Sequence, residues 1–171
     1  IDYIKPFNQI SCLIVGYGRI GKRILTLLNS LGMNIKYISR NNQDMFKYSD
    51  SITNCDISNF DFIINTLPLT PETNNYFTKK TFGKMNKSSY IINVGRGETI
   101  NENDLINALE TKQIRGAFLD VVQNEPISHD NPLLKLDNIF ISPHIANAMC
   151  NALNTQVKVF IDKLIKYKKK I

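Results

Sequence analysis

The sequence predicts an α/β fold in which helices cover both faces of a doubly wound parallel sheet. The first observation is an apolar, partly β-branched run over 10–15, which is typical of a buried strand. The second is the motif Gly16-x-Gly18-x-x-Gly21, which follows this run and opens a helical pattern. The third is the alternation of strand and helix patterns along most of the chain, which favours parallel strands joined by crossover helices.

Apolar spacing and turn residues place the individual elements. The predicted strands cover 10–15, 34–39, 61–67, 89–94, 116–122 and 138–142. The predicted helices cover Ile20 to Leu31, Thr78 to Met85, the stretch after Asn101, and a long stretch from Asn147. Gly32 stands where a helix C-cap belongs, and Asn101 is expected to cap its helix. The polar stretch 41–59 is expected to hold little regular structure.

The glycine motif predicts a dinucleotide site. Gly16 permits a tight turn, Gly18 lets a pyrophosphate approach the backbone, and Gly21 lets the helix pack closely on the strand. Free N–H groups at the start of the helix would face the phosphates. The alternative is an ordinary turn with a cluster of glycines, but the strand before the motif and the helix after it favour dinucleotide binding.

Composition limits the classes of partner. With 43 % hydrophobic and 21 % charged residues, the chain of 171 residues reads as a folded globular domain. It shows no signal-peptide layout and no apolar run long enough for a bilayer, so no membrane partner is expected. The net charge of +6 owes much to lysines between 163 and 170. No aromatic or arginine pattern accompanies them, so a solvated helix end is favoured over nucleic-acid binding.

The cysteines predict neither a metal site nor a disulfide framework. Cys12, Cys55 and Cys150 are odd in number, lie far apart, and show no CxxC spacing. They are interpreted as small buried hydrophobic residues in a reducing compartment, which indicates a cytoplasmic location.

Three ionisable residues lie just beyond predicted strands. Arg96, Glu125 and His144 each follow a strand, and ligands of open parallel sheets bind at that edge. A histidine beside a carboxylate can hold a proton ready for donation, and an arginine can grip a substrate carboxylate with two hydrogen bonds. The set therefore suits hydride transfer to a 2-oxo acid. Singly, each residue is also compatible with a purely structural role: a surface charge, a loop carboxylate or a capped histidine.

The motifs resemble those of the D-isomer-specific 2-hydroxyacid dehydrogenases. They are Gly16-Tyr17-Gly18-Arg19-Ile20-Gly21, Leu67-Pro68-Leu69-Thr70-Pro71-Glu72-Thr73, Ile92-Asn93-Val94-Gly95-Arg96-Gly97, Gly116-Ala117-Phe118-Leu119-Asp120-Val121-Val122, Glu125-Pro126 and Ser142-Pro143-His144-Ile145-Ala146. Their order across nearly the whole chain is far more specific than any one motif.

The resemblance implies roles for individual residues. It makes Arg96, Glu125 and His144 the catalytic set, and it places Asp120 at the nicotinamide end of the cofactor. The cofactor would be lined further by Arg19 and Ile20 of the glycine motif, and by Leu67, Pro68 and Val94.

The end of the second strand bears on cofactor choice. NAD-specific relatives place an acidic residue there, whereas this chain has Ser39 followed by Arg40. Serine can hydrogen bond a 2′-phosphate and arginine can pair with it, so NADP(H) is the expected cofactor, with NAD(H) possible. With Asn65-Thr66-Leu67-Pro68, this pair looks most like the glyoxylate/hydroxypyruvate reductase branch. Arg40 could also point to solvent, which would leave the two cofactors equivalent.

The resemblance also implies a domain organisation. Residues 1–146 would form an NAD(P)-binding Rossmann domain, and the helix over 147–171 would normally return to a substrate domain that is largely absent here. The expected partners are a small 2-oxo or 2-hydroxy acid and a second copy of the chain in a homodimer. Two alternatives stay open: a corepressor-like or regulatory nucleotide-binding module without catalysis, and a degenerate remnant.

Overall fold

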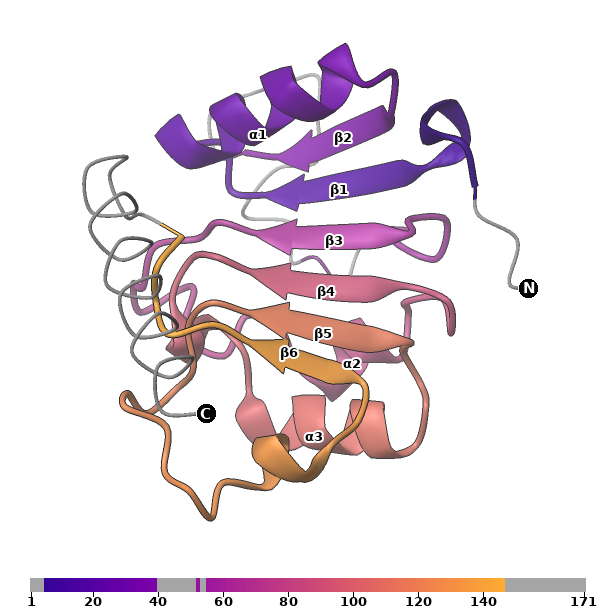
Figure 1. Cartoon of the computed structure of the whole chain (residues 1–171). Coiled ribbons are helices and arrows are strands. Elements are labelled where there is room, and N and C mark those ends of the chain that lie inside the picture. Colours follow the sequence, from indigo (N-terminus) through magenta and orange to yellow (C-terminus); the bar gives the residue numbers. More distant parts are fainter. Residues whose placement is uncertain (1–4, 40–51, 53–54, 147–171) are drawn as a thin grey trace, which may run out of the picture.

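Six strands form one parallel sheet in the part of the chain that the structure describes, residues 5–39, 52 and 55–146. In this computed structural model the strand order is β2-β1-β3-β4-β5-β6 (Figure 1). The strands are β1 (Ser11–Val15), β2 (Asn34–Ile38), β3 (Phe62–Asn65), β4 (Tyr90–Asn93), β5 (Gly116–Leu119) and β6 (Ile139–Ile141). The chain adds β2 on one side of β1 and β3 on the other, as a doubly wound sheet requires, so the predicted fold class is confirmed.

Three α-helices connect these strands: α1 (Arg19–Ser30), α2 (Lys79–Phe82) and α3 (Glu102–Glu110). Short 3₁₀ helices cover Phe7–Gln9, Gly97–Thr99 and Pro132–Lys135. The predicted helix from Asn147 and the residues Arg40 and Cys150 lie outside the described residues.

The helix ends follow from local chemistry. Gly32 has a φ of +77°, the left-handed conformation that often follows a helix and that glycine adopts without strain. The Asn101 side chain accepts a hydrogen bond from the Asp104 amide at 3.1 Å, which confirms the predicted cap of α3. α2 is shorter than the predicted 78–85 because its following amides bond carbonyls three residues back, and the helix tightens into a turn.

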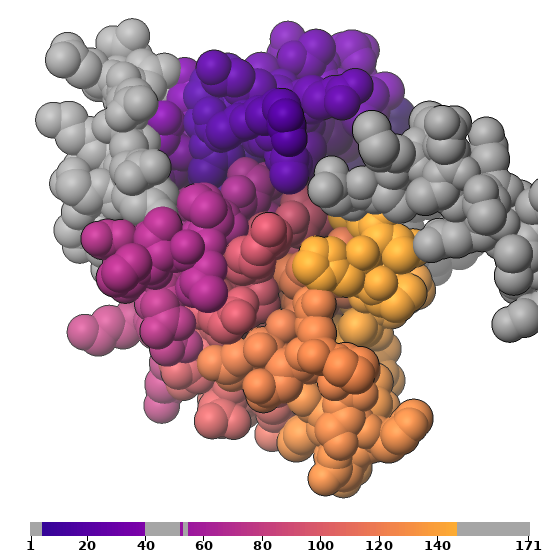
Figure 2. All heavy atoms as spheres, turned by 90° about the vertical axis from the view of Figure 1, so that its left-hand side faces the viewer, coloured from indigo at the N-terminus to yellow at the C-terminus, as the bar shows by residue number. Residues whose placement is uncertain are grey.

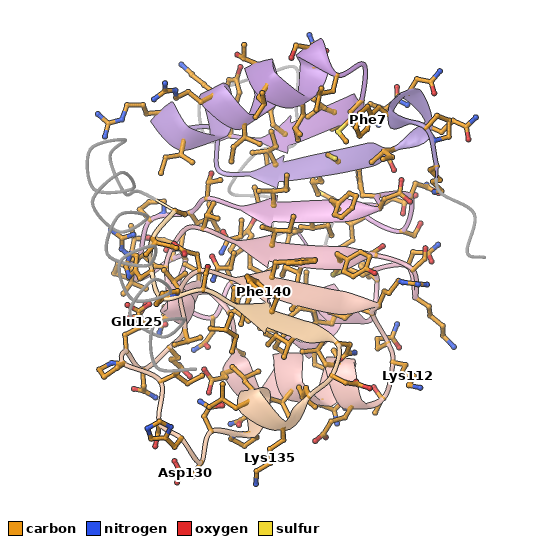
Figure 3. The ribbon with its side chains drawn as sticks, in the orientation of Figure 1. Phe7, Lys112, Glu125, Asp130, Lys135 and Phe140 are labelled. Carbon is orange, nitrogen blue, oxygen red and sulfur yellow. The ribbon has the colours of Figure 1, made fainter. Side chains whose placement is uncertain are left out.

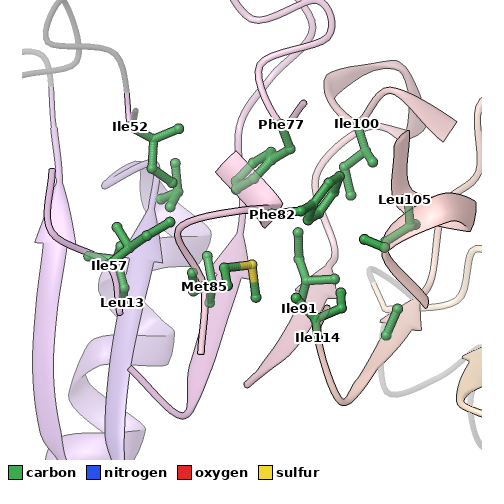
Figure 4. Close-up of a cluster of buried hydrophobic side chains, with 14 of the residues drawn as sticks. Leu13, Ile52, Ile57, Phe77, Phe82, Met85, Ile91, Ile100, Leu105 and Ile114 are labelled. Carbon is green, nitrogen blue, oxygen red and sulfur yellow. The ribbon is translucent and has the colours of Figure 1, made fainter. Parts of the chain in front are cut away.

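The main core lies between the sheet and the two helices α2 and α3, which cover one of its faces (Figure 4). Phe82 of α2 and Leu105 of α3 belong to one buried cluster with Leu13, Ile63 and Ile91 of the strands. Side chains alternate between the two faces of a strand, so Ile14 points to the opposite side. There it faces Gly21 of α1, which places α1 on the other face of the sheet.

An aromatic row crosses the face that α1 leaves uncovered. Phe62, Tyr90, Phe118 and Phe140 stand on four neighbouring strands, with successive ring centroids 5.7, 5.7 and 6.2 Å apart. Phe118 is 42 % exposed and Phe140 60 % exposed. Among the described elements, α1 packs on β1 and β2, at the other end of the strand order from Phe118 and Phe140.

Two of the three cysteines, Cys12 and Cys55, lie in the described residues, and both are buried thiols. Burial, and next the negative charge of Asp61, raise the pKa of Cys12 to about 11. Cys12 is therefore a protonated, weakly nucleophilic thiol at neutral pH.

Candidate active site

All six strands end at one edge of the sheet, which the arrowheads in Figure 1 mark and which faces the viewer in Figure 2. The glycine turn follows β1 at this edge, and the loops after β3, β4, β5 and β6 lie beside it. Ligands of open parallel sheets bind here, where the strand order reverses between β1 and β3.

The glycine turn has the tight geometry that its spacing predicts. Gly16 has a φ of +98°, and a Cβ there would lie 2.9 Å from Thr66 Oγ1. The Thr66 hydroxyl donates to the Gly16 carbonyl at 2.6 Å and so ties the turn to the loop after β3. A Cβ at Gly21 would lie 2.2 Å from the Gly16 carbonyl oxygen. Only glycine fits either position as the backbone stands, which confirms the predicted turn and close packing.

The space at the start of α1 fits an anionic ligand. Gly18 is the N-cap of α1, and a Cβ there would meet nothing within 4 Å. No side chain caps the helix, so the amides of its first turn, from Arg19 and Ile20 onward, are left for another acceptor. The positive end of the helix dipole adds to this preference for negative charge. These residues therefore suit a dinucleotide phosphate.

Ser39 comes directly after β2 and is partly buried. It stands at the same edge of the sheet as the glycine turn, where the predicted ribose contact would form. Whether Ser39 selects the cofactor stays a prediction, because its neighbour Arg40 lies outside the described residues.

Two buried amide side chains order the loops after β3 and β4. Asn65 and Asn93 are paired in the sheet register, and Asn65 Nδ2 donates to Asn93 Oδ1 at 2.9 Å. Asn65 Oδ1 accepts from the Leu67 amide at 3.0 Å, and Asn93 Oδ1 accepts from the Gly95 amide at 3.0 Å. Each asparagine thus fixes the loop that leaves its own strand. Thr99 joins this network by accepting from Asn65 Nδ2 at 2.6 Å.

Arg96 lies between two glycines, Gly95 and Gly97, whose backbone packs closely against the loops after β3 and β5. A Cβ at Gly95 would lie 2.6 Å from the Leu67 carbonyl oxygen, and a Cβ at Gly97 would lie 2.0 Å from that of Val122. The glycines let the Arg96 loop sit between the loops after β3 and β5. The arginine side chain is exposed, and its Nη1 donates to the Gly95 carbonyl at 2.7 Å.

Glu125 and His144 meet side by side. Their contact joins His144 Nδ1 to Glu125 Oε2 at 2.7 Å. The other Glu125 oxygen accepts from the Val122 amide at 3.2 Å, so the carboxylate is held at both oxygens. Figure 3 shows Glu125 at the carboxyl edge, and Asp130 at the far end of the same loop. Both side chains of the pair are partly exposed, which leaves His144 Nε2 available for a ligand.

Asp120 connects the end of β5 to the loop that carries His144. Its carboxylate accepts hydrogen bonds from the Ser142 hydroxyl at 2.7 Å and from the amides of Ile145 and Ala146, each at 2.8 Å. Its carbonyl accepts from the His144 amide at 2.9 Å. This residue, which is 7 % exposed, thus binds one loop at four points.

A pocket of about 550 Å³ adjoins these residues. It is lined by Asp120, Val122, Glu125, Pro126, Ile127, Leu134, Ile141, Ser142, Pro143 and His144. The structure therefore brings Asp120, Glu125 and His144 to one pocket. The glycine turn and Arg96 stand at the same edge but do not line it.

Sequence reasoning missed the residues that order these loops. Asn65, Asn93, Thr99 and Ser142 all lie in or beside the motifs, but their partners are 22 to 34 residues away in the chain. The one sequence signal that could have identified them is a polar residue at the end of an apolar run, because a polar group buried there needs a hydrogen-bond partner.

Neither a membrane span nor a metal cluster is found in the described residues. None of their helices is long and apolar enough to cross a bilayer. They also contain no group of three or more histidine, cysteine, aspartate or glutamate side chains placed to hold a metal.

Comparison with known proteins decides the family. Residues 3–146 match the family model for the NAD binding domain of D-isomer specific 2-hydroxyacid dehydrogenases. The chain belongs to this family. Its described sheet is therefore the Rossmann-type NAD-binding domain of this family, as the motifs predicted, and the alternative of a corepressor-like or regulatory module is not favoured.

Curated relatives of this NAD-binding domain include proteins that are named as reductases. It is 37 % identical over 158 residues to a probable 2-ketogluconate reductase of Dictyostelium discoideum, covering 89 % of this chain and 47 % of the relative. It is also 37 % identical over 157 residues to glyoxylate/hydroxypyruvate reductase B of Escherichia coli, covering 89 % and 48 %. The chain spans about half the length of these relatives.

Solved structures show the same fold. A probable 2-hydroxyacid dehydrogenase of Rhizobium etli, in complex with NADP, superposes with a TM-score of 0.76 at 28 % identity, over 96 % of this chain and 55 % of that one. An NADPH-dependent glyoxylate/hydroxypyruvate reductase of Sinorhizobium meliloti, in complex with NADP and malonate, gives a TM-score of 0.75 at 30 % identity, over 92 % and 50 %.

Proposed function

We propose that the chain is the cofactor-binding and catalytic-residue half of a reductase that transfers hydride from NADPH to a small 2-oxo acid of the glyoxylate or hydroxypyruvate type. The observation that carries this proposal is the 2.7 Å contact between His144 Nδ1 and Glu125 Oε2 at the edge that also holds the glycine turn. A histidine fixed by a carboxylate, beside a dinucleotide turn, is the arrangement that reduction of a carbonyl needs.

The nicotinamide ring supplies hydride when the cofactor is bound. Gly16, Gly18 and the first turn of α1, which includes Arg19 and Ile20, would hold the pyrophosphate. Backbone around Leu67 and Val94, together with Pro68, lines the cleft. These assignments extend the fit at Gly18, where the backbone is open to an approaching phosphate.

The remaining steps belong to the three ionisable residues. Glu125 receives the Nδ1 proton of His144 in a hydrogen bond, which fixes the ring and stabilises the imidazolium. His144 would donate its Nε2 proton to the carbonyl oxygen of the substrate, as a general acid in the reduction. Arg96 binds the substrate carboxylate and polarises the carbonyl, which its exposed guanidinium is free to reach by leaving the Gly95 carbonyl.

NADP(H) is the proposed cofactor, with NAD(H) as a weaker alternative. Support comes from the absence of an acidic residue at Ser39 and from the NADP complexes of the two solved relatives. A homodimer and a cytoplasmic location complete the proposal. Analytical ultracentrifugation of the chain with and without NADPH tests the dimer.

The first experiment is a fluorescence titration of the chain with NADPH and with NADH, followed by addition of glyoxylate. Binding of NADPH at lower concentration than NADH supports the proposed domain and its preference. Oxidation of NADPH by glyoxylate extends the proposal to catalysis by this chain alone. Binding without turnover assigns catalysis to a longer protein. No binding of either nucleotide overturns the proposal.

A further inference from the structure

His144 has an unusual backbone conformation. Its φ is +53°, in the left-handed region that residues other than glycine adopt infrequently. Such a conformation persists where the surrounding structure holds it in place. What holds it therefore also decides where the imidazole points.

One carboxylate holds the loop on both sides of His144. Asp120 Oδ1 accepts from the Ser142 hydroxyl before the histidine and from the Ile145 amide after it, at 2.7 and 2.8 Å. Asp120 Oδ2 accepts from the Ala146 amide at 2.8 Å, and the Asp120 carbonyl accepts from the His144 amide at 2.9 Å. These bonds fix the backbone before, at and after the left-handed residue.

The Asp120 carboxylate stays ionised in this position. Burial raises the pKa of Asp120, but hydrogen bonds from Ser142, Ala146 and Ile145, with the nearby charge of His144, lower it by more, so the pKa lies below its ordinary value. Hydrogen bonds to an ionised acceptor are stronger than bonds between neutral groups. The carboxylate is thus a firm anchor for the loop near neutral pH.

We propose that Asp120 and Ser142 form a positioning pair, which holds the backbone of His144 in the left-handed region and thereby aims its imidazole at Glu125. This inference rests on the proposed function, which gives His144 its role as proton donor. The pair acts through His144 and need not touch the substrate. The role is additional to the nicotinamide contact expected of Asp120, because a carboxylate has about four acceptor positions and three are filled by the loop.

Two substitutions weaken the pair to different degrees. Asp120→Asn keeps an oxygen for Ser142 and Ile145 but turns an amide nitrogen toward the Ala146 amide, where two donors would oppose each other. Ser142→Ala removes one bond of the set, and Ser142→Thr restores the hydroxyl.

A second serine–aspartate pair supplies matched controls. The Ser128 hydroxyl donates to the Asp130 carboxylate in an exposed loop, and neither residue lines the pocket that Asp120 and Ser142 line. Asp130→Asn and Ser128→Ala make the same chemical changes there as at the proposed pair. His129, the other histidine of the chain, serves as an internal reference in the spectra of the Asp120 and Ser142 variants.

The test is nuclear magnetic resonance of the whole 171-residue chain without cofactor. A strong cross-peak between the amide and α protons of His144 marks a left-handed φ, and the ring Nδ1 signal reports its hydrogen bond to Glu125. We expect both to weaken in Asp120→Asn and Ser142→Ala, the Ala146 amide proton to move upfield in Asp120→Asn, and Ser142→Thr to restore the wild-type signals. His129 signals stay unchanged in the Asp120 and Ser142 variants, and His144 signals stay unchanged in the control variants.

Because no nucleotide enters this readout, a chain that binds no NADPH still tests the inference. A parallel NADPH titration separates the two roles of Asp120. Weaker NADPH binding by Asp120→Asn with unchanged His144 signals would assign Asp120 to the cofactor alone and overturn the pair. Unchanged His144 signals in Ser142→Ala would also overturn it. If Asp120→Asn does not fold, Ser142→Ala and Ser142→Thr decide the question.

Discussion

The Glu125 carboxylate lies between two donors, with His144 Nδ1 at 2.7 Å on one oxygen and the Val122 amide at 3.2 Å on the other. The backbone bond keeps the carboxylate from following the imidazole if the ring moves. The histidine is therefore held against a fixed negative charge, which leaves Nε2 as the ring atom that faces a ligand. The proton donation proposed for His144 would depend on both the proton at Nε2 and the Glu125 charge on the other side of the ring.

We predict that His144→Gln lowers the rate of NADPH oxidation by glyoxylate about 10²- to 10⁴-fold, the usual contribution of a positioned general acid. Glu125→Gln removes the charge but keeps the shape, so its loss of rate is smaller. Neither variant changes NADPH affinity, because neither residue belongs to the glycine turn. Stopped-flow absorbance under saturating NADPH measures the rate, and fluorescence titration measures the affinity. His129→Gln is the control, and an equal loss in that variant would contradict the assignment.

Substitution by alanine is predicted to have different effects at two glycines of the motif: Gly21→Ala lowers stability, whereas Gly18→Ala lowers NADPH affinity. Alanine at a helical glycine ordinarily adds about 0.5–1 kcal/mol of stability. Gly21→Ala should instead cost about 1–3 kcal/mol, because its Cβ would lie 2.2 Å from the Gly16 carbonyl oxygen. Gly18→Ala meets nothing within 4 Å, so it keeps the stability of the fold but obstructs the pyrophosphate.

Urea unfolding and NADPH titration of both variants check this contrast. Gly21→Ala loses stability, whereas Gly18→Ala unfolds like the wild type and binds NADPH severalfold more weakly. Wild-type affinity in a folded Gly18→Ala variant would argue against phosphate binding at this turn.

The sequence predicts features that depend on near neighbours better than those that depend on register. The tight turn at Gly16 and the cap at Asn101 follow from residues within a few positions of each other, and both are present. The pairing of Asn65 with Asn93 depends on how β3 and β4 align, which their apolar patterns leave open. The left-handed backbone of His144 depends on Asp120, 24 positions earlier, and the residues next to His144 in the sequence do not predict it.

The Thr99 hydroxyl is predicted to be a stability determinant of the Arg96 loop. It is fully buried, accepts from Asn65 Nδ2 at 2.6 Å and donates to the Arg96 carbonyl at 2.5 Å. Thr99→Val keeps the shape but removes one hydrogen bond from each partner, while Asn65 Nδ2 still donates to Asn93 and the Arg96 carbonyl still accepts from Asn93 Nδ2. The expected loss is about 0.5–1.5 kcal/mol for each hydrogen bond removed. Urea unfolding measures the loss. Thr26→Val on the exposed face of α1 is the matched control, and an equal effect there would contradict the prediction.

The stability of the fold should depend on pH through Asp61. Burial raises the pKa of this carboxyl group, but hydrogen bonds from Lys5 and Ser11 outweigh burial and leave the pKa below its ordinary value of 3.8. A lowered pKa in the folded state stabilises the protein above the unfolded value. That contribution is lost as the pH falls through the folded pKa.

The free energy of unfolding is therefore expected to fall as the pH drops below about 4, the ordinary range of an aspartate. Asp61→Asn should be less stable at pH 7 and should lose less on acidification. Urea unfolding at a series of pH values measures both effects. Asp137→Asn, at an exposed carboxylate, is the control, and a slope in Asp61→Asn equal to that of the wild type would refute the role of this group.

Cofactor choice gives the last prediction, which rests on the sequence Ser39-Arg40 after β2. An arginine can pair with the 2′-phosphate that NADPH carries and NADH lacks. Arg40→Asp replaces this attraction with repulsion. NADPH affinity should fall roughly ten- to a hundredfold, the equivalent of about 1.5–3 kcal/mol for a charged hydrogen bond. NADH affinity should change little, because no phosphate is lost. Parallel fluorescence titrations measure both, with the exposed Arg23→Asp as a control for the general loss of positive charge. Equal losses of affinity for the two cofactors would show that Arg40 does not recognise the 2′-phosphate.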